Sequence, residues 1–145
     1  MEIINEMRVM FLSKSENESF SRVAAASFIS PLDPTVSELV EIKTAVSEAV
    51  SNAIIHGYDG TIGVVTLEMR ILDTRTVEIT VTDQGKGIPD IEKAKEPLFT
   101  TKPDEERAGM GFTVMETFMD SMEIDSAPDK GTRIMMKKSL TTDLT

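Results

Sequence analysis

The chain has 145 residues and a formal net charge of −10, a size typical of one domain with a buried core. The negative charge argues against direct binding to nucleic acid, whose phosphates would repel it, and the absence of cysteine excludes disulfides and thiolate chemistry. Because no apolar run approaches the roughly 20 residues of a membrane span and no signal peptide opens the sequence, we expect a cytoplasmic protein without membrane contact.

The first part of the sequence predicts a strand followed by a helix. Residues 7–11 alternate between apolar and polar side chains, as a strand does. Ser15 and Glu18 fit a capping box that opens a helix reaching about residue 30. We expect its core side to carry an apolar stripe of Phe20, Val23, Ala24 and Phe28.

A second, longer helix follows the prolines at 31 and 34. Thr35 and Glu38 form its predicted capping box, and Gly57 is a natural stop signal at its end. Its apolar face comprises Leu39, Ile42, Val46, Val50, Ala53 and Ile54.

The second half of the sequence predicts two hairpins separated by an irregular stretch and a helix. The expected elements are strands at 64–71 and 77–81, an irregular stretch at 88–108, a helix at 111–119, and a final hairpin of 122–125 with 132–136. Such an order favours an α+β fold, a two-layer sandwich of a mixed or antiparallel sheet with helices on one face. We expect a single domain over 1–145, with an ordered core from about 6 to 138 and a frayed tail at 139–145.

Glu48 and Asn52 are the first candidate site residues. Their spacing of four places both on one helical face, roughly opposite the apolar stripe. Taken alone, such a pair is ordinarily a solvated polar face, but the small neighbours Ala45 and Ala49 leave room for a ligand.

Two glycine motifs lie downstream. Asp83 ends a strand and precedes Gly85 and Gly87, and Gly109-Met110-Gly111 opens a helix. Locally these are also compatible with an ordinary Asp-x-Gly turn and a loop glycine pair. Glycine admits close approach of the backbone, and amides at a helix N-terminus bind phosphate. Neither glycine pair fits the dinucleotide fingerprint, and no Walker motif occurs.

In this order, the three motifs resemble the N box, G1 box and G2 box of the GHKL ATPase/kinase superfamily, whose Bergerat fold is an α+β sandwich. Within it, residues 47–57, 96–103 and 109–112 look like the anti-sigma F factors of endospore-forming bacteria. The resemblance extends from about residue 6 to 138 and implies an ATP and Mg²⁺ site.

The resemblance also assigns roles to residues. It implies that Asn52 binds Mg²⁺, that Glu48 is the catalytic base or orients the attacking hydroxyl, and that Asp83 accepts a hydrogen bond from the adenine amine. The implied nucleotide contacts are Asn52, Asp83, Gly85, Gly87, Thr100, Thr101, Lys102, Gly109, Met110, Gly111 and Thr132, of which 100–102 belong to a lid over the phosphates.

The function that the resemblance implies is that of an anti-sigma factor and protein serine kinase. Such a protein is a homodimer that holds a sporulation sigma factor inactive and phosphorylates a serine of an anti-anti-sigma factor. Glu18 and Arg22, four apart on the first helix, are the candidate partner contacts, with a plain surface ion pair as the alternative.

Three other functions fit the motifs less well. A histidine kinase module would need a phosphoaccepting histidine, and His56 is the single histidine of the chain and belongs to the N box. An ATP-driven clamp would need a transducer domain. A nucleotide-binding module without phosphoryl transfer would not need the carboxylate of Glu48.

Overall fold

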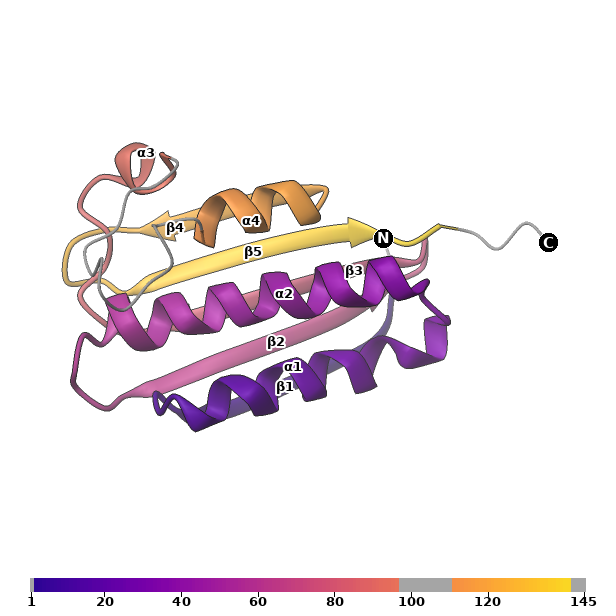
Figure 1. Ribbon diagram of the computed structural model, residues 1–145, viewed down its shortest axis with the longest axis horizontal. Coiled ribbons are helices and arrows are strands. Elements are labelled where there is room, and N and C mark those ends of the chain that lie inside the picture. Colours follow the sequence, from indigo (N-terminus) through magenta and orange to yellow (C-terminus); the bar gives the residue numbers. More distant parts are fainter. Residues whose placement is uncertain (1, 97–110, 142–145) are drawn as a thin grey trace.

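The computed structural model describes residues 2–96 and 111–141, which form a five-stranded sheet with the two long helices on one face (Figure 1). The strands are β1 (Ile3–Leu12), β2 (Val64–Leu72), β3 (Thr76–Asp83), β4 (Ser121–Ser126) and β5 (Thr132–Ser139), and the helical segments are α1 (Glu16–Ile29), η1 (Ser30–Leu32), α2 (Val36–Asn52), η2 (Ala53–Gly57), α3 (Ile91–Ala94) and α4 (Gly111–Phe118). The spatial order is β1-β2-β3-β5-β4, and every neighbouring pair is antiparallel. The expected α+β sandwich is therefore confirmed, with an antiparallel sheet.

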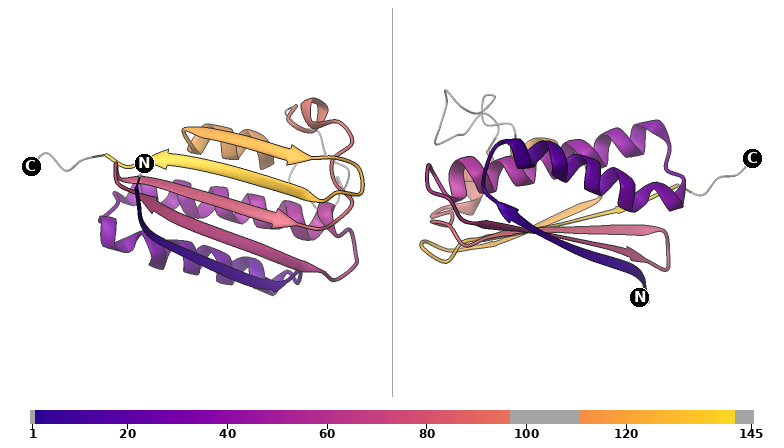
Figure 2. Two further views of the ribbon diagram at one scale, coloured as in Figure 1. Left: turned by 180° about the vertical axis from the view of Figure 1, so that it is seen from behind. Right: turned by 90° about the horizontal axis from the view of Figure 1, so that it is seen from below.

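The core lies between the sheet and the helices, as the side view in Figure 2 shows. Alternate side chains of the central strands point toward the helices, and α2 contributes the complementary apolar stripe. Completely buried examples are Leu67, Met69, Ile79 and Met136 from the sheet and Ile42, Val46 and Val50 from α2. No helix of the described residues is long and apolar enough to cross a bilayer.

Several elements extend beyond their predicted bounds. The first strand covers residues 3–12 instead of 7–11, and a short helix, α3, lies within the stretch expected to be irregular. The last strand continues to Ser139, and Leu140 is buried behind it, so the folded part of the chain reaches past residue 138.

The predicted core side of α1 is only partly right. Phe28 is buried and Ala24 packs against the core, but Phe20 and Val23 are exposed, and Ser21 and Ala25 are buried instead. Ser21 can be buried because its hydroxyl donates to the carbonyl of Glu18 at 2.6 Å. The capping box predicted at Ser15 is also absent, since Ser15 has helical dihedral angles and makes no capping hydrogen bond with its side chain.

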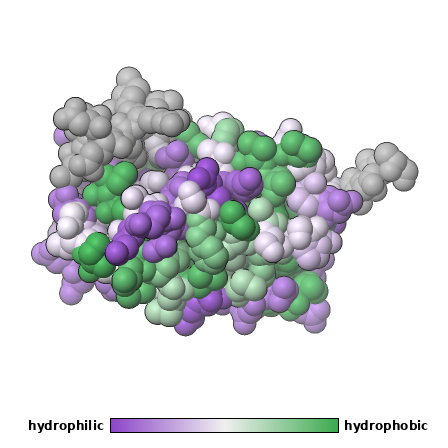
Figure 3. Space-filling model, turned by 60° about the horizontal axis from the view of Figure 1, so that its bottom comes forward, coloured by the Kyte–Doolittle hydropathy of each residue, from purple (hydrophilic) through white to green (hydrophobic). Residues whose placement is uncertain are grey.

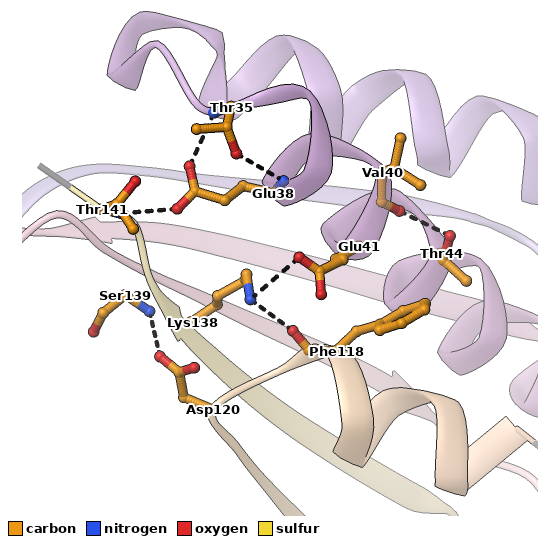
Figure 4. A network of polar contacts seen from close by, with 10 residues as sticks. All are labelled: Thr35, Glu38, Val40, Glu41, Thr44, Phe118, Asp120, Lys138, Ser139 and Thr141. Carbon is orange, nitrogen blue, oxygen red and sulfur yellow. Dashed lines mark hydrogen bonds and ion pairs between the residues drawn. The ribbon is translucent and has the colours of Figure 1, made fainter. Parts of the chain in front are cut away.

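The capping box of α2 is confirmed and is part of a larger polar network (Figure 4). Glu38 accepts a hydrogen bond from the main-chain nitrogen of Thr35 at 2.9 Å and another from that of Thr141 at 2.8 Å. Nearby, Lys138 donates to the carbonyl of Phe118 at 2.8 Å and pairs with Glu41 at 3.8 Å. At this end of the sandwich, side chains that hydrogen-bond to main-chain groups hold the start of α2 and the ends of α4 and β5 together.

Candidate functional site

At the opposite end, α2 does not stop at Asn52 but continues as a π-helical turn, η2. The wider turn is closed by a hydrogen bond from the main-chain nitrogen of Tyr58 to the carbonyl of Ala53 at 3.0 Å. Single π turns inside helices are uncommon and are frequent at functional sites. Gly57, expected to stop the helix, is the last residue of this turn.

Asn52 and Glu48 lie on successive turns of α2, and both side chains are half-buried. The amide nitrogen of Asn52 donates to the carbonyl of Glu48 at 3.0 Å, which directs its oxygen away from the helix axis. An amide oxygen presented in this way suits a hard cation such as Mg²⁺. Ala45 and Ala49, expected to leave room for a ligand, are instead completely buried in the core.

Asp83 is a buried carboxylate at the end of β3, with 5% of its surface exposed. Its Oδ1 accepts a hydrogen bond from the main-chain nitrogen of Gly85 at 2.8 Å, and the main chain of Thr132 donates a second one. Burial raises the pKa of Asp83, and these two bonds oppose the rise without cancelling it. The group therefore lacks part of the stabilisation that its charged form requires.

Glycines bring three segments into contact around Asp83. A Cβ on Gly57 would lie 2.8 Å from the Asp83 carboxyl carbon, and one on Gly85 would lie 2.0 Å from the carbonyl oxygen of Gly57. At Gly131, where φ is +75°, it would lie 2.2 Å from the carbonyl oxygen of Asp83. Gly85 of the second motif thus allows two segments of the protein to come into contact. The sequence suggested that it would let the main chain approach a ligand.

Gly87 shows the same behaviour, because a Cβ there would lie 1.9 Å from the carbonyl oxygen of Ala127. Thr132 lies directly across from Asp83 in the β3–β5 register, and its hydroxyl is 2.9 Å from that of Ser126. The pairing of β3 with β5 therefore places Thr132 beside Asp83, and both are among the implied nucleotide contacts.

A hydrogen bond and an ion pair, neither of which the sequence analysis predicted, hold the loop after η2 against this site. The hydroxyl of Tyr58 accepts a hydrogen bond from the main-chain nitrogen of Gln84 at 2.8 Å. Lys86 forms an ion pair with Asp59 at 3.0 Å. The only sequence signal was the placement of a tyrosine and an acid directly after the His-Gly of the first motif.

The predicted phosphate contacts are only partly described. Gly111 is buried at the start of α4, which packs against α2. Thr100, Thr101, Lys102, Gly109 and Met110 lie outside the described residues. Within residues 2–96 and 111–141, no cluster of three or more acids and histidines could hold a metal by itself, so a cation at Asn52 would depend on other ligands as well.

The candidate partner contacts lie on the side of α1 that faces α2. Arg22 pairs with Glu18 at 3.3 Å, and the Arg22 side chain is 43% exposed. Glu18 also accepts a hydrogen bond from the hydroxyl of Ser47, the residue before Glu48. The pair is therefore joined to the segment of α2 that carries Glu48, whereas the apolar stripe predicted for α1 would place it on the opposite side of that helix.

Comparison with known proteins agrees with this architecture. The family model described as a histidine kinase-like ATPase domain matches residues 15–138. A relative from Caldanaerobacter subterraneus subsp. tengcongensis, called anti-sigma F factor, is 58% identical over 138 residues, covering 95% of this chain and 96% of its own length. A protein with the same name from Clostridium perfringens (strain 13) is 59% identical over 139 residues, covering 95% and 99%.

Two solved structures share the fold at low sequence identity. The RsbU and RsbW domains of a Mycobacterium tuberculosis protein superpose with a TM-score of 0.70 at 15% identity, covering 96% of this chain and 33% of that one. The catalytic domain of the histidine kinase ThkA gives 0.55 at 19% identity, covering 97% of both chains.

Proposed function

This chain belongs to the histidine kinase-like ATPase domain family and, within it, to the anti-sigma F factors, and we propose that it is an ATP-dependent protein serine kinase that holds a sigma factor inactive. Its second proposed partner is an anti-anti-sigma factor, which it phosphorylates on serine. The observation that carries the nucleotide part of the proposal is the buried Asp83 carboxylate, which glycine backbone encloses and whose pKa is raised by burial.

The residues present fit a bound Mg²⁺-ATP, which supplies the transferable phosphoryl group. Asp83 accepts a hydrogen bond from the adenine amine, where guanine would present an oxygen acceptor instead. The Asn52 amide oxygen would hold Mg²⁺, and the main-chain amides at the start of α4, at Gly111, would hold phosphate. Thr100, Thr101, Lys102, Gly109 and Met110 remain predicted phosphate contacts.

Glu48 is the proposed catalytic residue. It lies one helical turn before Asn52, so a base at Glu48 would be on the same side of α2 as the cation that Asn52 would hold. The carboxylate of Glu48 takes the proton of the attacking serine hydroxyl, while positioning and charge stabilisation provide the rest of the acceleration.

The two protein partners are proposed to share a surface that includes Glu18 and Arg22. Glu18 is the less exposed member, at 20%, and supports the guanidinium of Arg22, which also donates to the hydroxyl of Ser19 at 3.1 Å. An arginine supported in this way presents a cation to an acidic partner at small entropic cost. Overlap of the two contacts would explain how one partner displaces the other.

The test of the kinase proposal is a phosphorylation assay with the anti-anti-sigma protein of the same organism. Glu48→Gln should keep ATP affinity while lowering the rate of serine phosphorylation by about 10²–10⁴-fold, the range for a lost general base. Glu41→Gln makes the same chemical change two turns earlier on α2 and should phosphorylate normally. A wild-type rate for Glu48→Gln would reject Glu48 as the base.

The same proteins test the partner surface by pull-down. Arg22→Glu should bind both partners more weakly than the wild type at unchanged ATP affinity. Arg133→Glu, an exposed charge reversal on the other face of the sheet, is the control. Undiminished capture of both partners by Arg22→Glu would leave the pair as a surface ion pair.

A further inference from the structure

The loop that joins η2 to β2 carries a tyrosine whose hydroxyl makes two hydrogen bonds. Tyr58 is half-buried, whereas residues 59–62 are exposed. The loop lies at the left end of the molecule in Figure 1, and Figure 3 shows hydrophilic and apolar side chains mixed on the surface at that end. Such a mixture is usual for a protein surface. Tyr58 sets this loop apart from an ordinary surface turn, because its hydroxyl contacts the main chain where β2 begins and where β3 ends.

The hydroxyl of Tyr58 stands between two main-chain groups that would otherwise face each other. It donates to the carbonyl of Val64, the first residue of β2, and accepts from the nitrogen of Gln84, the residue after β3, at 2.8 Å. The last pair in the β2–β3 register is Val65 with Asp83, so Val64 and Gln84 are the next pair outward. A side-chain oxygen therefore occupies the place at which the next bond of the ladder would form.

The direction of the main-chain groups in β2 supports this assignment. The nitrogen of Ser13 donates to the carbonyl of Gly63 at 2.8 Å, so Gly63 directs its main-chain groups toward β1. Because successive residues of a strand direct these groups to opposite sides, Val64 directs its own toward β3. In a regular antiparallel ladder, Gln84 would donate straight to the carbonyl of Val64. The tyrosine oxygen is inserted into that bond and keeps the two chains apart just after Asp83.

The chain that follows Asp83 turns toward η2 at this separation. The nitrogen of Lys86 donates to the carbonyl of Gly57 at 2.8 Å, and a Cβ on Gly85 would lie 2.0 Å from that same oxygen. A direct ladder bond would continue the chain beside β2 and away from Gly57. The inserted hydroxyl thus favours the path that brings the end of β3 against η2.

The two amides that follow Asp83 are both engaged. The amide of Gln84 binds the Tyr58 hydroxyl, and that of Gly85 donates to Oδ1 of Asp83 at 2.8 Å. The orientation of the carboxylate therefore depends on the main chain at residues 84 and 85. Since hydrogen bonds weaken steeply as their angle and distance depart from the optimum, a small shift of this main chain would weaken a bond that Asp83 accepts from a ligand.

The ring of Tyr58 is held in place from two sides. A Cβ on Gly63 would lie 2.2 Å from the ring atom Cε1, so the ring packs directly on the Gly63 main chain. Gly63 is itself fixed, because its nitrogen donates to the Ser13 hydroxyl at 3.0 Å. On the other side, the nitrogen and the hydroxyl of Thr61 both donate to the Tyr58 carbonyl, at 3.0 and 2.6 Å. These contacts give the tyrosine hydroxyl a defined position.

We propose that Tyr58 is a positioning residue for nucleotide recognition: its hydroxyl replaces a ladder bond at the end of β3 and so sets the position from which Asp83 accepts the amine of the base. The inference deepens the proposed function, on which the contact between Asp83 and the adenine amine rests. Tyr58 need not touch the nucleotide, since it acts through the main chain of Gln84.

A nucleotide that lacks the amine tests the coupling. Purine riboside triphosphate has hydrogen in place of the 6-amino group of ATP and keeps the sugar and phosphates. Calorimetry of the wild type should show ATP bound about tenfold or more tightly than this analogue, as expected for a hydrogen bond to a charged group. Tyr58→Phe removes the hydroxyl and keeps the ring. It should lower ATP affinity about five- to tenfold and the affinity of the analogue by less than about twofold.

The ratio of the two affinities separates positioning from a merely structural role. A loss of general stability around the site would weaken both nucleotides alike and leave the ratio unchanged. Positioning of Asp83 affects only the nucleotide that carries the amine, so the ratio should contract. The thermal unfolding midpoint, measured on every variant, reports whether the variant is folded.

A second variant displaces the ring and keeps the hydroxyl. Gly63→Ala places a Cβ where the ring of Tyr58 lies and should contract the ratio in the same way. Thr61→Val is the matched control, because it removes a hydroxyl from the same loop that binds the Tyr58 carbonyl and not Gln84. This control should keep the wild-type ratio.

A double-mutant cycle tests whether Tyr58 acts through Asp83. In the Asp83→Asn background, the bond that Tyr58 positions is already impaired. Adding Tyr58→Phe should therefore lower ATP affinity by less than about twofold, compared with about five- to tenfold in the wild-type background. Equal losses in the two backgrounds would show that the two residues act independently.

The proposal is overturned if Tyr58→Phe or Gly63→Ala keeps the wild-type ratio, if Thr61→Val contracts it equally, or if the cycle shows independent effects. A wild type that prefers ATP, together with a Tyr58→Phe variant that keeps this preference, would reject the inference and leave the proposed function standing. A wild type that binds ATP and the analogue equally would reject the contact of Asp83 with the amine, and this inference with it.

Discussion

Two buried carboxylates at opposite ends of the sandwich have pKa values displaced in opposite directions. Glu38, 7% exposed at the start of α2, has a lowered pKa, because hydrogen bonds from Thr141 and Thr35 outweigh the burial that would raise it. Asp83, 5% exposed at the end of β3, has a raised pKa, because burial outweighs the bonds from Gly85 and Thr132. Surface exposure alone therefore does not determine the outcome: Asp83 lies deeper in the protein than Glu38 and accepts fewer hydrogen bonds, and both differences raise its pKa relative to that of Glu38.

The difference agrees with the two roles that we propose, a carboxylate that completes the fold at Glu38 and one that binds the nucleotide at Asp83. At Glu38 each oxygen accepts a main-chain hydrogen bond, one from Thr35 and one from Thr141. At Asp83 the main chains of Gly85 and Thr132 donate, but burial of the carboxylate outweighs these two bonds, so a further donor would stabilise its charged form. The adenine amine is a donor of the required kind, which is why we place the base of the nucleotide there.

The largest expected effect is the loss of ATP affinity when Asp83 is substituted. Asp83→Asn replaces a carboxylate by a group that also donates, so one of its contacts with the adenine amine turns repulsive. We expect ATP binding to weaken by roughly 1–3 kcal/mol, the scale of a hydrogen bond to a charged group. Calorimetry with ATP and GTP measures it. Equal affinity of the wild type for both nucleotides would contradict the assignment.

A smaller effect is expected at the Glu38 end. Glu38→Gln keeps the shape of the capping box but loses the charge, and should lower the free energy of unfolding at neutral pH by about 1 kcal/mol without changing ATP affinity. Since the folded pKa of Glu38 is lowered, this loss is complete above the ordinary glutamate pKa and disappears as pH falls through the lowered value. Urea unfolding at several pH values would show it. A loss independent of pH would contradict the electrostatic cause.

The smallest effect is the opposite pH dependence at Asp83 in the absence of nucleotide. Because its folded pKa is raised, Asp83 contributes stability that is complete below the ordinary aspartate pKa and is lost as pH rises through the raised value. The thermal unfolding midpoint of Asp83→Asn should therefore rise relative to that of the wild type as pH rises from acid to neutral. Thermal scans in matched buffers measure the difference. If the thermal midpoints of the wild type and of Asp83→Asn changed with pH in the same way, Asp83 would not have the raised pKa that separates it from Glu38.

Local patterns predicted the elements that local chemistry determines. The capping box of Thr35 and Glu38 could be predicted because both partners lie within one helical turn. The core side of α1 could not, because burial of Ser21 depends on a hydrogen bond to Glu18 and on how α1 packs against α2. A helical wheel ranks residues by polarity alone and therefore chose Phe20 and Val23.

Residue types at the site could be predicted, but not what brings them together. Asp83 and Thr132 are adjacent because β5 pairs with β3 ahead of β4, an order that spacing along the chain does not reveal. The close contact of Gly57 with Asp83 likewise depends on tertiary packing. The lid residues Thr100, Thr101 and Lys102 lie outside the described residues, and their role stays a prediction.

The π turn at residues 53–57 has a consequence for how the sequence can vary. A π turn holds one residue more than the α-helical turn that it replaces, and here the additional residue sets the angle at which Gly57 reaches the Asp83 carboxyl. Deleting any one residue of the segment would restore α-helical geometry and rotate Gly57 away, whichever side chains remained. Over evolutionary time, residues 54–56 should therefore accept substitutions more readily than insertions or deletions, whereas Gly57 is restricted by its contact with Asp83.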